Sequence, residues 1–252
     1  MATKQELVRD LRALGIKEND TVLVHSSLSA LGFIEGGAET VIEALKEIIT
    51  EGGNLLFPTL SYATVNLDNL NFDVRNTPCC VGIIPETFRK QPDVIRSIHP
   101  THSVCVWGKD KVALTSGHEN DHTPVGPNSP FRKLPEYNGK ILMLGCSTRS
   151  NTFMHGMEDL ADVPYHLREK PFAYKITNYE GITYEHLSRA HNFAPQGLIQ
   201  RYDRVPDILK PDEFVCGTVL EGTAYLYDAA KLQAAAVKKM KEDPFFFVDK
   251  GE

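Results

Sequence analysis

The segment 142–158 brings together residue types that can perform acid–base chemistry. It has the pattern of a buried strand, a turn of small residues and the start of a helix, and such a turn directs backbone N–H groups and a helix N-terminus toward one point. His155 and Glu158 are three residues apart, so they share a face of that helix. A glutamate that accepts the imidazole Nδ1–H fixes the tautomer and leaves Nε2 as a base. Thr152 lies one turn earlier on nearly the same face, where its hydroxyl could donate to an oxyanion.

The same pair has a simpler interpretation. A histidine and a glutamate three residues apart also stabilise an exposed helix without doing any chemistry. The strand and the glycine turn that precede the helix favour a functional pair, but residue spacing leaves both interpretations open.

Two further histidine pairs make metal binding the main rival chemistry. His99 and His102, and also His118 and His122, have ligand-like spacings, and several histidines with one carboxylate suit zinc. Both pairs lie in segments rich in Pro, Gly and Asp, and the H-E-x-x-H motif of zinc proteases is absent. We therefore expect no metal, with a zinc hydrolase as the alternative.

Nucleophilic catalysis has less support. Ser26 and Ser27 follow a buried strand, but the chain has no G-x-S-x-G motif. Serines in that position more often cap a turn or bind a phosphate or an amide. Cys146 lies in the turn before the helix, where a small buried residue needs no catalytic role. A P-loop and a G-x-G-x-x-G motif are also absent, so a nucleotide-type cofactor would have to be held by loops.

The composition excludes several classes of protein. The 27 Lys and Arg residues against 33 Asp and Glu give a net charge of −6, whereas a nucleic-acid surface usually needs a basic patch. No apolar run approaches the ~18 residues of a membrane span, and the N-terminus lacks the apolar stretch of a signal peptide. Five cysteines without a CxxC spacing argue against a disulfide framework or a structural zinc site. We expect a reduced, cytoplasmic protein that binds neither nucleic acid nor membrane.

Hydrophobic periodicity predicts the elements that position these residues. Strands are expected at 21–25, 54–57, 103–107 and 140–144, and hairpins at 172–184 and 214–227. Helices are expected at 3–15, 41–49, 81–89, 150–162 and 228–242, and polar loops at 61–78 and 118–130. This order predicts an α/β protein with α+β character. We expect a single-domain α/β/α sandwich over residues 1–252, with a central mixed sheet and a hairpin-rich C-terminal part.

Ordered blocks along the chain carry a family resemblance. They are VHSSL at 24–28 with Gly32, Gly36 and Gly37 after it, FPT at 57–59, FDVRNTP at 72–78 followed by Gly82, Glu86, Phe88 and Arg89, RSIHPTHSV at 96–104, GPNSPFRKL at 126–134, and residues 151–158 with His155 and Glu158. Over roughly its whole length the sequence resembles the aminoglycoside 3-N-acetyltransferase family, also called the antibiotic N-acetyltransferase family.

The resemblance implies a transferase that uses acetyl-CoA, without a metal, to acetylate an amine directly and without a covalent acyl-enzyme. His155 would be the general base, Glu158 its orienting partner, and Thr152 the residue beside the thioester. The pantetheine and phosphate path would be lined by the turn after the first strand, the segment before the third, and part of the block at 126–134. These residues are Ser26, Ser27, Leu28, His99, Pro100, Thr101, Ser103, Val104, Ser129 and Phe131.

The resemblance also implies an acidic acceptor pocket built from loops. The candidates are Asp73, Tyr62, Asp159 and Asp162, with Asp73 first. An Asx turn before Pro78 is the alternative role for Asp73.

The leading function is acetylation of the 3-N amine of an aminoglycoside antibiotic, with antibiotic resistance as the associated role. One alternative is the same chemistry on another metabolite amine, and a second is a CoA-binding protein without antibiotic activity. The expected partners are CoA and a small-molecule amine, and a homodimer is the candidate assembly.

Overall fold

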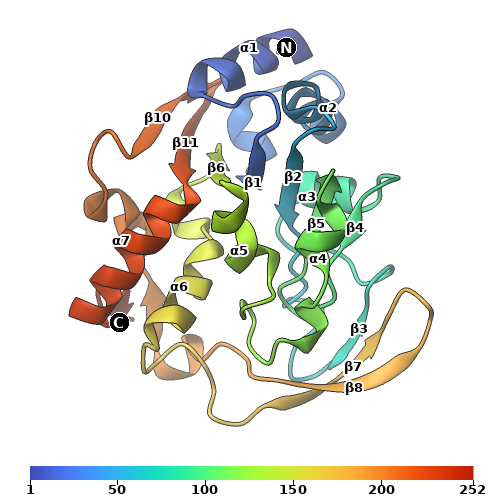
Figure 1. Cartoon of the computed structure of the whole chain (residues 1–252), viewed down its shortest axis with the longest axis vertical. Helices are drawn as coiled ribbons and strands as arrows, with labels where there is room; N and C mark the ends of the chain where they lie inside the picture. Colours follow the sequence, from blue (N-terminus) through green and yellow to red (C-terminus); the bar gives the residue numbers. More distant parts are fainter. Residues whose placement is uncertain (252) are drawn as a thin grey trace.

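A seven-stranded mixed sheet forms the middle of the molecule (Figure 1). The computed structural model describes residues 1–251; Glu252, the last residue of the expected domain, lies outside them. Strands β1, β2 and β6 are parallel neighbours, and the remaining pairs are antiparallel. Across the sheet the order is β10 (Phe214–Val219), β11 (Gly222–Asp228), β6 (Lys140–Leu144), β1 (Thr21–Ser26), β2 (Asn54–Pro58), β5 (Val104–Gly108) and β4 (Ile95–Arg96). The predicted mixed sheet is confirmed.

Helices cover both faces of this sheet, as predicted for an α/β/α sandwich (Figure 1). One face packs against α1 (Lys4–Leu14), α2 (Gly37–Ile49) and α3 (Ile83–Arg89). The other packs against α4 (Lys111–Thr115), α5 (Pro130–Lys133), α6 (Phe153–Ala161) and α7 (Ala229–Glu242). In β1, Val22 and Val24 join the first core and Leu23 joins the second, because successive side chains of a strand point to opposite faces.

Local signals account for most of the helix ends. Thr3 and Glu6 form a reciprocal capping box at the start of α1, and Gly15 ends that helix in the left-handed conformation. The Asp228 side chain accepts from the Lys231 N–H at the start of α7. Helix α2 ends at Ile49, as predicted, but it begins at Gly37, four residues before the predicted start.

The largest departure is a second, three-stranded sheet of β3 (Asn71–Asp73), β7 (Phe172–Thr177) and β8 (Thr183–Ser188). The hairpin β7–β8 is confirmed, but it lies outside the central sheet, at the lower right of Figure 1. Residues 71–73, predicted as loop, pair in parallel with β7. This pairing buries Phe72 in a separate small core with Tyr174 and Ile176. A third sheet pairs β9 (Leu198–Gln200) with β12 (Val248–Lys250).

The parallel strands bring three chain segments to one edge of the central sheet. The carboxyl ends of β1, β2 and β6 fall at Ser26, Pro58 and Leu144, and β1 and β6 are in register up to Ser26 and Leu144. Ligands of α/β proteins bind outside the carboxyl ends of parallel strands. The turn that leads into α6 follows β6 at this edge. None of the described helices is both long enough and apolar enough to cross a bilayer.

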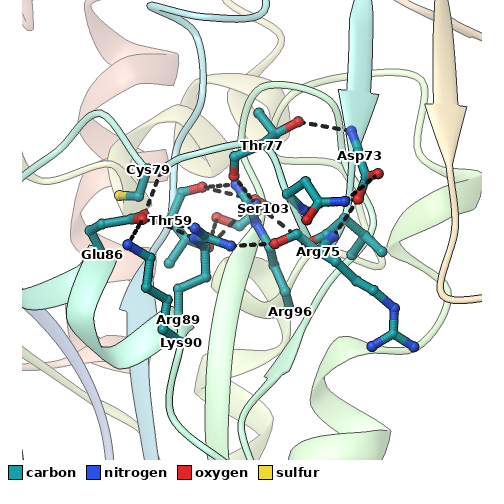
Figure 2. A network of polar contacts seen from close by, with 12 residues as sticks. Thr59, Asp73, Arg75, Thr77, Cys79, Glu86, Arg89, Lys90, Arg96 and Ser103 are labelled. Carbon is teal, nitrogen blue, oxygen red and sulfur yellow. Dashed lines mark hydrogen bonds and ion pairs between the residues drawn. The ribbon is translucent and has the colours of Figure 1, made fainter.

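A buried arginine fastens the segment 59–77 to the sheet (Figure 2). Arg96 in β4 is 3% exposed and donates to the backbone carbonyl oxygens of Thr59 at 2.7 Å and Thr77 at 2.6 Å. Its Nε donates to Ser103 Oγ at 2.8 Å. Burial lowers the pKa of Arg96, because it removes the charged guanidinium from water. These hydrogen bonds connect β4 of the central sheet to the segment around Thr77, which follows β3 of the three-stranded sheet.

Candidate active site

A cavity of about 850 Å³ opens at the carboxyl edge of β1, β2 and β6. Its wall combines the end of β1, the segment 58–67, the start of α6 and the segment 190–202. The polar residues of this wall include His25, Ser26, Tyr62, Thr101, His102, Arg149, Thr152, His155, Arg168, His191, Gln200 and Tyr202. The predicted helix therefore enters a cavity formed by segments far apart in the sequence.

His155 and Glu158 make a buried pair on α6. His155 Nδ1 lies 2.9 Å from Glu158 Oε2, and the glutamate side chain is fully buried. Tyr202 Oη lies 3.0 Å from the same nitrogen, and Tyr165 Oη donates to Glu158 Oε1 at 3.5 Å. On the other side of the ring, Nε2 has only a long 3.5 Å contact with Gln200 Nε2. Because the pair is buried, its interpretation as an exposed helix-stabilising pair is wrong.

The surroundings favour a neutral imidazole. Burial lowers the pKa of His155, and the nearby His166 lowers it further. Burial raises the pKa of Glu158, while the hydroxyls of Tyr202 and Tyr165 oppose this by hydrogen bonding to it. A neutral His155 that donates its Nδ1–H to Glu158 keeps a lone pair on Nε2, and its ring lines the cavity.

Thr152 is held at the N-terminus of α6 by a histidine that sequence reasoning did not select. The Thr152 N–H donates to His25 Nε2 at 3.0 Å. Burial lowers the pKa of His25 to about 3, so its ring is neutral, with its proton on Nδ1. Since the backbone N–H is used in this way, the hydroxyl is the donor that Thr152 can offer to a ligand. His25 lies in the 24–28 block, but the pairing with residue 152 has no local signal.

Two more histidines surround His155. The ring centroid of His191 lies 4.0 Å from that of His155 and 4.8 Å from that of His102, and the centroids of His102 and His155 are 5.8 Å apart. The two histidine pairs of the zinc alternative therefore do not form one site. His99 stacks on His118 at 4.9 Å, and His122 stacks on His186 at 5.5 Å. His191 was not predicted, because residues 190–192 carry no recognisable motif and reach the site only through the fold.

The predicted cofactor residues divide into two groups. Ser26 and Thr101 line the main cavity, while Ser26, Ser27 and Leu28 line an adjoining one of about 530 Å³. The hydroxyl oxygen of Ser26 is buried and has no hydrogen-bond partner among residues 1–251, which fits a group that receives a ligand. The two cavities and this hydroxyl are compatible with an extended cofactor.

The other predicted cofactor residues form hydrogen bonds within the protein or pack in its core. His99 Nδ1 accepts the N–H groups of Thr101 and His102, and the Pro100 carbonyl accepts from Ser61 Oγ. Ser103 donates to the Thr59 carbonyl, and Ser129 caps α5 by accepting the N–H of Phe131. Val104 and Phe131 are 0% exposed in the core. The structure does not bring this group, His99, Pro100, Ser103, Val104, Ser129 and Phe131, to either cavity wall.

The predicted acceptor residues need a similar correction. Tyr62 lines the cavity. Asp73 does not: its carboxylate accepts the N–H groups of Arg75 and Asn76 and the Asn76 amide, which is the Asx turn considered as its alternative role (Figure 2). Asp159 pairs with Arg132 and contacts His166, and Asp162 ends α6 in the left-handed conformation. Local structure uses the carboxylates of Asp73 and Asp159 and the backbone of Asp162, and all three residues lie outside the cavity wall.

Known proteins similar to this chain carry names that agree with the family resemblance of its sequence blocks. A family model described as aminoglycoside 3-N-acetyltransferase matches residues 23–241. Aminoglycoside N(3)-acetyltransferase VII of Streptomyces paromomycinus is 34% identical over 179 residues, which are 64% of this chain and 62% of that protein. The prophage-derived aminoglycoside N(3')-acetyltransferase-like protein YokD of Bacillus subtilis (strain 168) is 35% identical over 173 residues, 61% of this chain and 63% of that protein. The matched part of the chain thus spans less than two thirds of either relative.

Solved structures match over almost the whole chain. The structure called AAC-IIIb binary with CoASH has a TM-score of 0.83 at 27% identity, and the match covers 96% of this chain and 97% of that one. The structure called AAC-VIa bound to sisomicin has a TM-score of 0.82 at 26% identity, covering 96% and 98% of the two chains.

Proposed function

The chain belongs to the aminoglycoside 3-N-acetyltransferase family, and from this premise we propose that it transfers the acetyl group of acetyl-CoA to a primary amine. The observation that carries the proposal is His155, whose ring lines the cavity while its Nδ1 lies 2.9 Å from buried Glu158. A base in this arrangement serves amine acylation, because only an unprotonated amine attacks a thioester.

The chemistry can be assigned to groups of the chain itself. Glu158 accepts the Nδ1–H of His155 and so directs the lone pair of Nε2 toward the amine. His155 Nε2 takes a proton from the amine nitrogen as that nitrogen forms its bond to the thioester carbon. The Thr152 hydroxyl donates to the carbonyl oxygen as it becomes an oxyanion. The carbon–sulfur bond then breaks, and His155 returns the proton to the departing thiolate, which leaves an amide and CoA.

Ser26 is the main candidate for contact with CoA. Its unpartnered hydroxyl lies where the main cavity meets the adjoining one. The adjoining wall includes Gly37 at the first position of α2, and a helix N-terminus suits a phosphate group. We assign the pantetheine arm to Ser26 and Thr101, and the phosphate end to Ser27, Leu28 and the start of α2.

The pH dependence should follow the acceptor and not an ordinary histidine. Burial lowers the pKa of His155, so the base stays unprotonated below neutral pH and lowering the pH removes mainly the free amine. The logarithm of kcat/KM should rise with pH until the amine pKa, and the inflection should move when acceptors of different amine pKa are compared. An inflection fixed near pH 6.5 for every acceptor would show that His155 titrates normally and would contradict this assignment.

Two acceptor classes have support. The family model, the names of the relatives and the sisomicin-bound neighbour support an aminoglycoside acetylated at its 3-N position. The charge of the cavity supports a different amine. Among residues 1–251 no aspartate or glutamate lines the wall, whereas Arg149 and Arg168 do. A cavity with arginines and neutral histidines disfavours a polycation.

The second candidate acceptor is therefore a small amine that also carries a carboxylate or phosphate group. Arg168 is the candidate contact for that anion, because it is only partly exposed and lies one residue from Leu167, which bridges to His191. On charge, this class fits the cavity better than an aminoglycoside does.

A panel of amines tests both acceptor classes. CoA release would be measured with sisomicin, with an amino sugar that has no acidic group, and with amines that carry a carboxylate or a phosphate, such as amino acids and phosphoethanolamine. We expect the highest kcat/KM with an anionic amine, and Arg168→Ala should raise its KM about tenfold or more without altering the KM of acetyl-CoA. Arg149→Ala, the matched change at the exposed cavity arginine, should have a smaller effect on the amine.

The panel also distinguishes a wrong acceptor class from a wrong assignment of the chain as a transferase. Turnover with sisomicin alone would reject the anionic acceptor and retain the transferase. Binding of acetyl-CoA without turnover of any amine would support a CoA-binding protein instead. Absence of acetyl-CoA binding would reject the proposed function itself.

A further inference from the structure

We propose that His102, His155 and His191 form a binding site for a zinc ion in the wall of the cavity. The three residues come from separate parts of the chain: the segment between β4 and β5, helix α6, and the segment between β8 and β9. One ligand nitrogen from each ring can be chosen so that all three atoms lie within 4.8 Å of one another. Within the described part of the chain this is the group of His, Cys, Asp or Glu residues that meets a metal-site geometry.

The hydrogen bonds leave the required nitrogens available. The Nδ1 atom of His102 is bonded to Thr101 Oγ1 at 2.9 Å, and that of His155 to Glu158 at 2.9 Å. In both rings Nε2 is left to act as a ligand, apart from the long contact of His155 with Gln200. His191 takes part in the ring contacts with both, but its nitrogens form no hydrogen bond with other residues in 1–251. Apart from the 3.5 Å contact of Gln200 with His155, no donor among residues 1–251 occupies these imidazole nitrogens.

The geometry matches zinc after a small adjustment. Zinc binds imidazole nitrogen at about 2.0–2.1 Å, so tetrahedral ligand nitrogens lie about 3.4 Å apart. Closing the present spacing to that value requires rotations of side chains that border an open cavity. Three protein ligands leave a fourth position for water or another small ligand on the cavity side. Glu158, bonded to the second nitrogen of His155, supplies the outer carboxylate that orients metal-binding histidines.

Other histidines of the chain do not complete the site. His99 accepts two backbone N–H groups and stacks on His118, whose Nδ1 is bonded to Ser97 Oγ. His122 lies elsewhere, bonded to the Leu187 carbonyl. These contacts restrict the zinc ligands to the three cavity histidines.

Zinc in this site would inhibit the reaction proposed above, and this consequence rests on the proposed function. The ion would occupy the Nε2 lone pair of His155, which then cannot accept a proton from the amine. Zinc binding itself is independent of whether the protein acetylates anything.

The test is a titration of the full chain, prepared without a polyhistidine tag, with zinc chloride against a competing chromogenic chelator. We expect one tight ion per chain. His102→Ala and His191→Ala should each weaken the binding by about tenfold or more, since even outer partners of a zinc site contribute about 10- to 100-fold. His122→Ala is the matched control and should bind zinc like the unmodified protein. Equal zinc binding by all four proteins, or no ion bound at micromolar concentration, would overturn the proposal.

A second measurement separates this inference from the proposed function. Zinc should abolish amine-dependent CoA release, and a chelator should restore it. If zinc binds as expected but no amine is acetylated under any condition, the metal site stands and the transferase assignment fails. If transfer is rapid and insensitive to bound zinc, the ion does not reach the base and the proposed site is wrong.

Discussion

Replacing His155 with alanine should lower kcat by about 10²- to 10⁴-fold, the usual contribution of a general base. The expected loss is in kcat because Nε2 of His155 is proposed to act on the amine during attack and not to hold the cofactor. The affinity for acetyl-CoA, measured by equilibrium titration, should stay within a few-fold of the unmodified value. Steady-state CoA release with a saturating amine gives kcat.

The alanine variant also leaves Glu158 buried without its partner, so folding must be checked independently. His155→Gln retains most of the side-chain volume and a polar group beside Glu158, but it has no basic nitrogen. Both variants should lose activity to a similar degree, and circular dichroism should show the same fold for each. His122→Ala, a histidine outside the cavity, should retain full kcat. A His155→Ala protein with near-normal kcat would remove histidine from the proposed mechanism.

Replacing Arg96 with methionine should reduce the free energy of unfolding by about 3–5 kcal/mol. Buried hydrogen bonds of a charged group contribute about 1.5–3 kcal/mol each, and an acceptor left unpaired costs about 1–3 kcal/mol. Arg96→Met removes donors from the carbonyl oxygens of Thr59 and Thr77 and from Ser103 Oγ. Losses of this size are typical of a broken buried network. Urea denaturation followed by circular dichroism gives the value.

Arg75→Met is the matched control for this experiment. Arg75 is exposed and donates to the Tyr179 carbonyl, and surface substitutions usually change stability by less than about 0.5 kcal/mol. A loss of less than 1 kcal/mol in Arg96→Met would mean that the carbonyl groups find other partners. The hydrogen bonds of Arg96 would then contribute little to holding the three-stranded sheet against the central sheet.

Much of the fold could be predicted from local patterns. The buried strands at 21–26 and 140–144 are short apolar runs, and the first helix carries its own start and stop residues. The spacing of His155 and Glu158 is also local, since one turn of helix fixes it. Strand β3 could not be predicted in this way, because its stability comes from pairing with β7 about a hundred residues later.

The site residues also divide into those that a local pattern predicts and those that only contacts between distant segments bring together. A sequence block that resembles a family marks a stretch of chain without saying which of its side chains face a ligand. In the block at 96–104, Val104 enters the core and Ser103 binds the arginine network, whereas Thr101 and His102 reach the cavity. His191 and Tyr202 reach His155 from segments without any motif. Asp73 had the right chemical type for an acceptor site, but its carboxylate closes a turn.

A crystal structure of the protein with bound acetyl-CoA would show directly whether His155 lies at the reacting thioester. We predict that the thioester lies in the 850 Å³ cavity, with its carbonyl beside Thr152 and its carbon open to an amine that contacts His155 Nε2. Ser26 Oγ should bond to the pantetheine arm. A thioester bound outside this cavity, or one from which His155 is out of reach, would contradict the proposed active site.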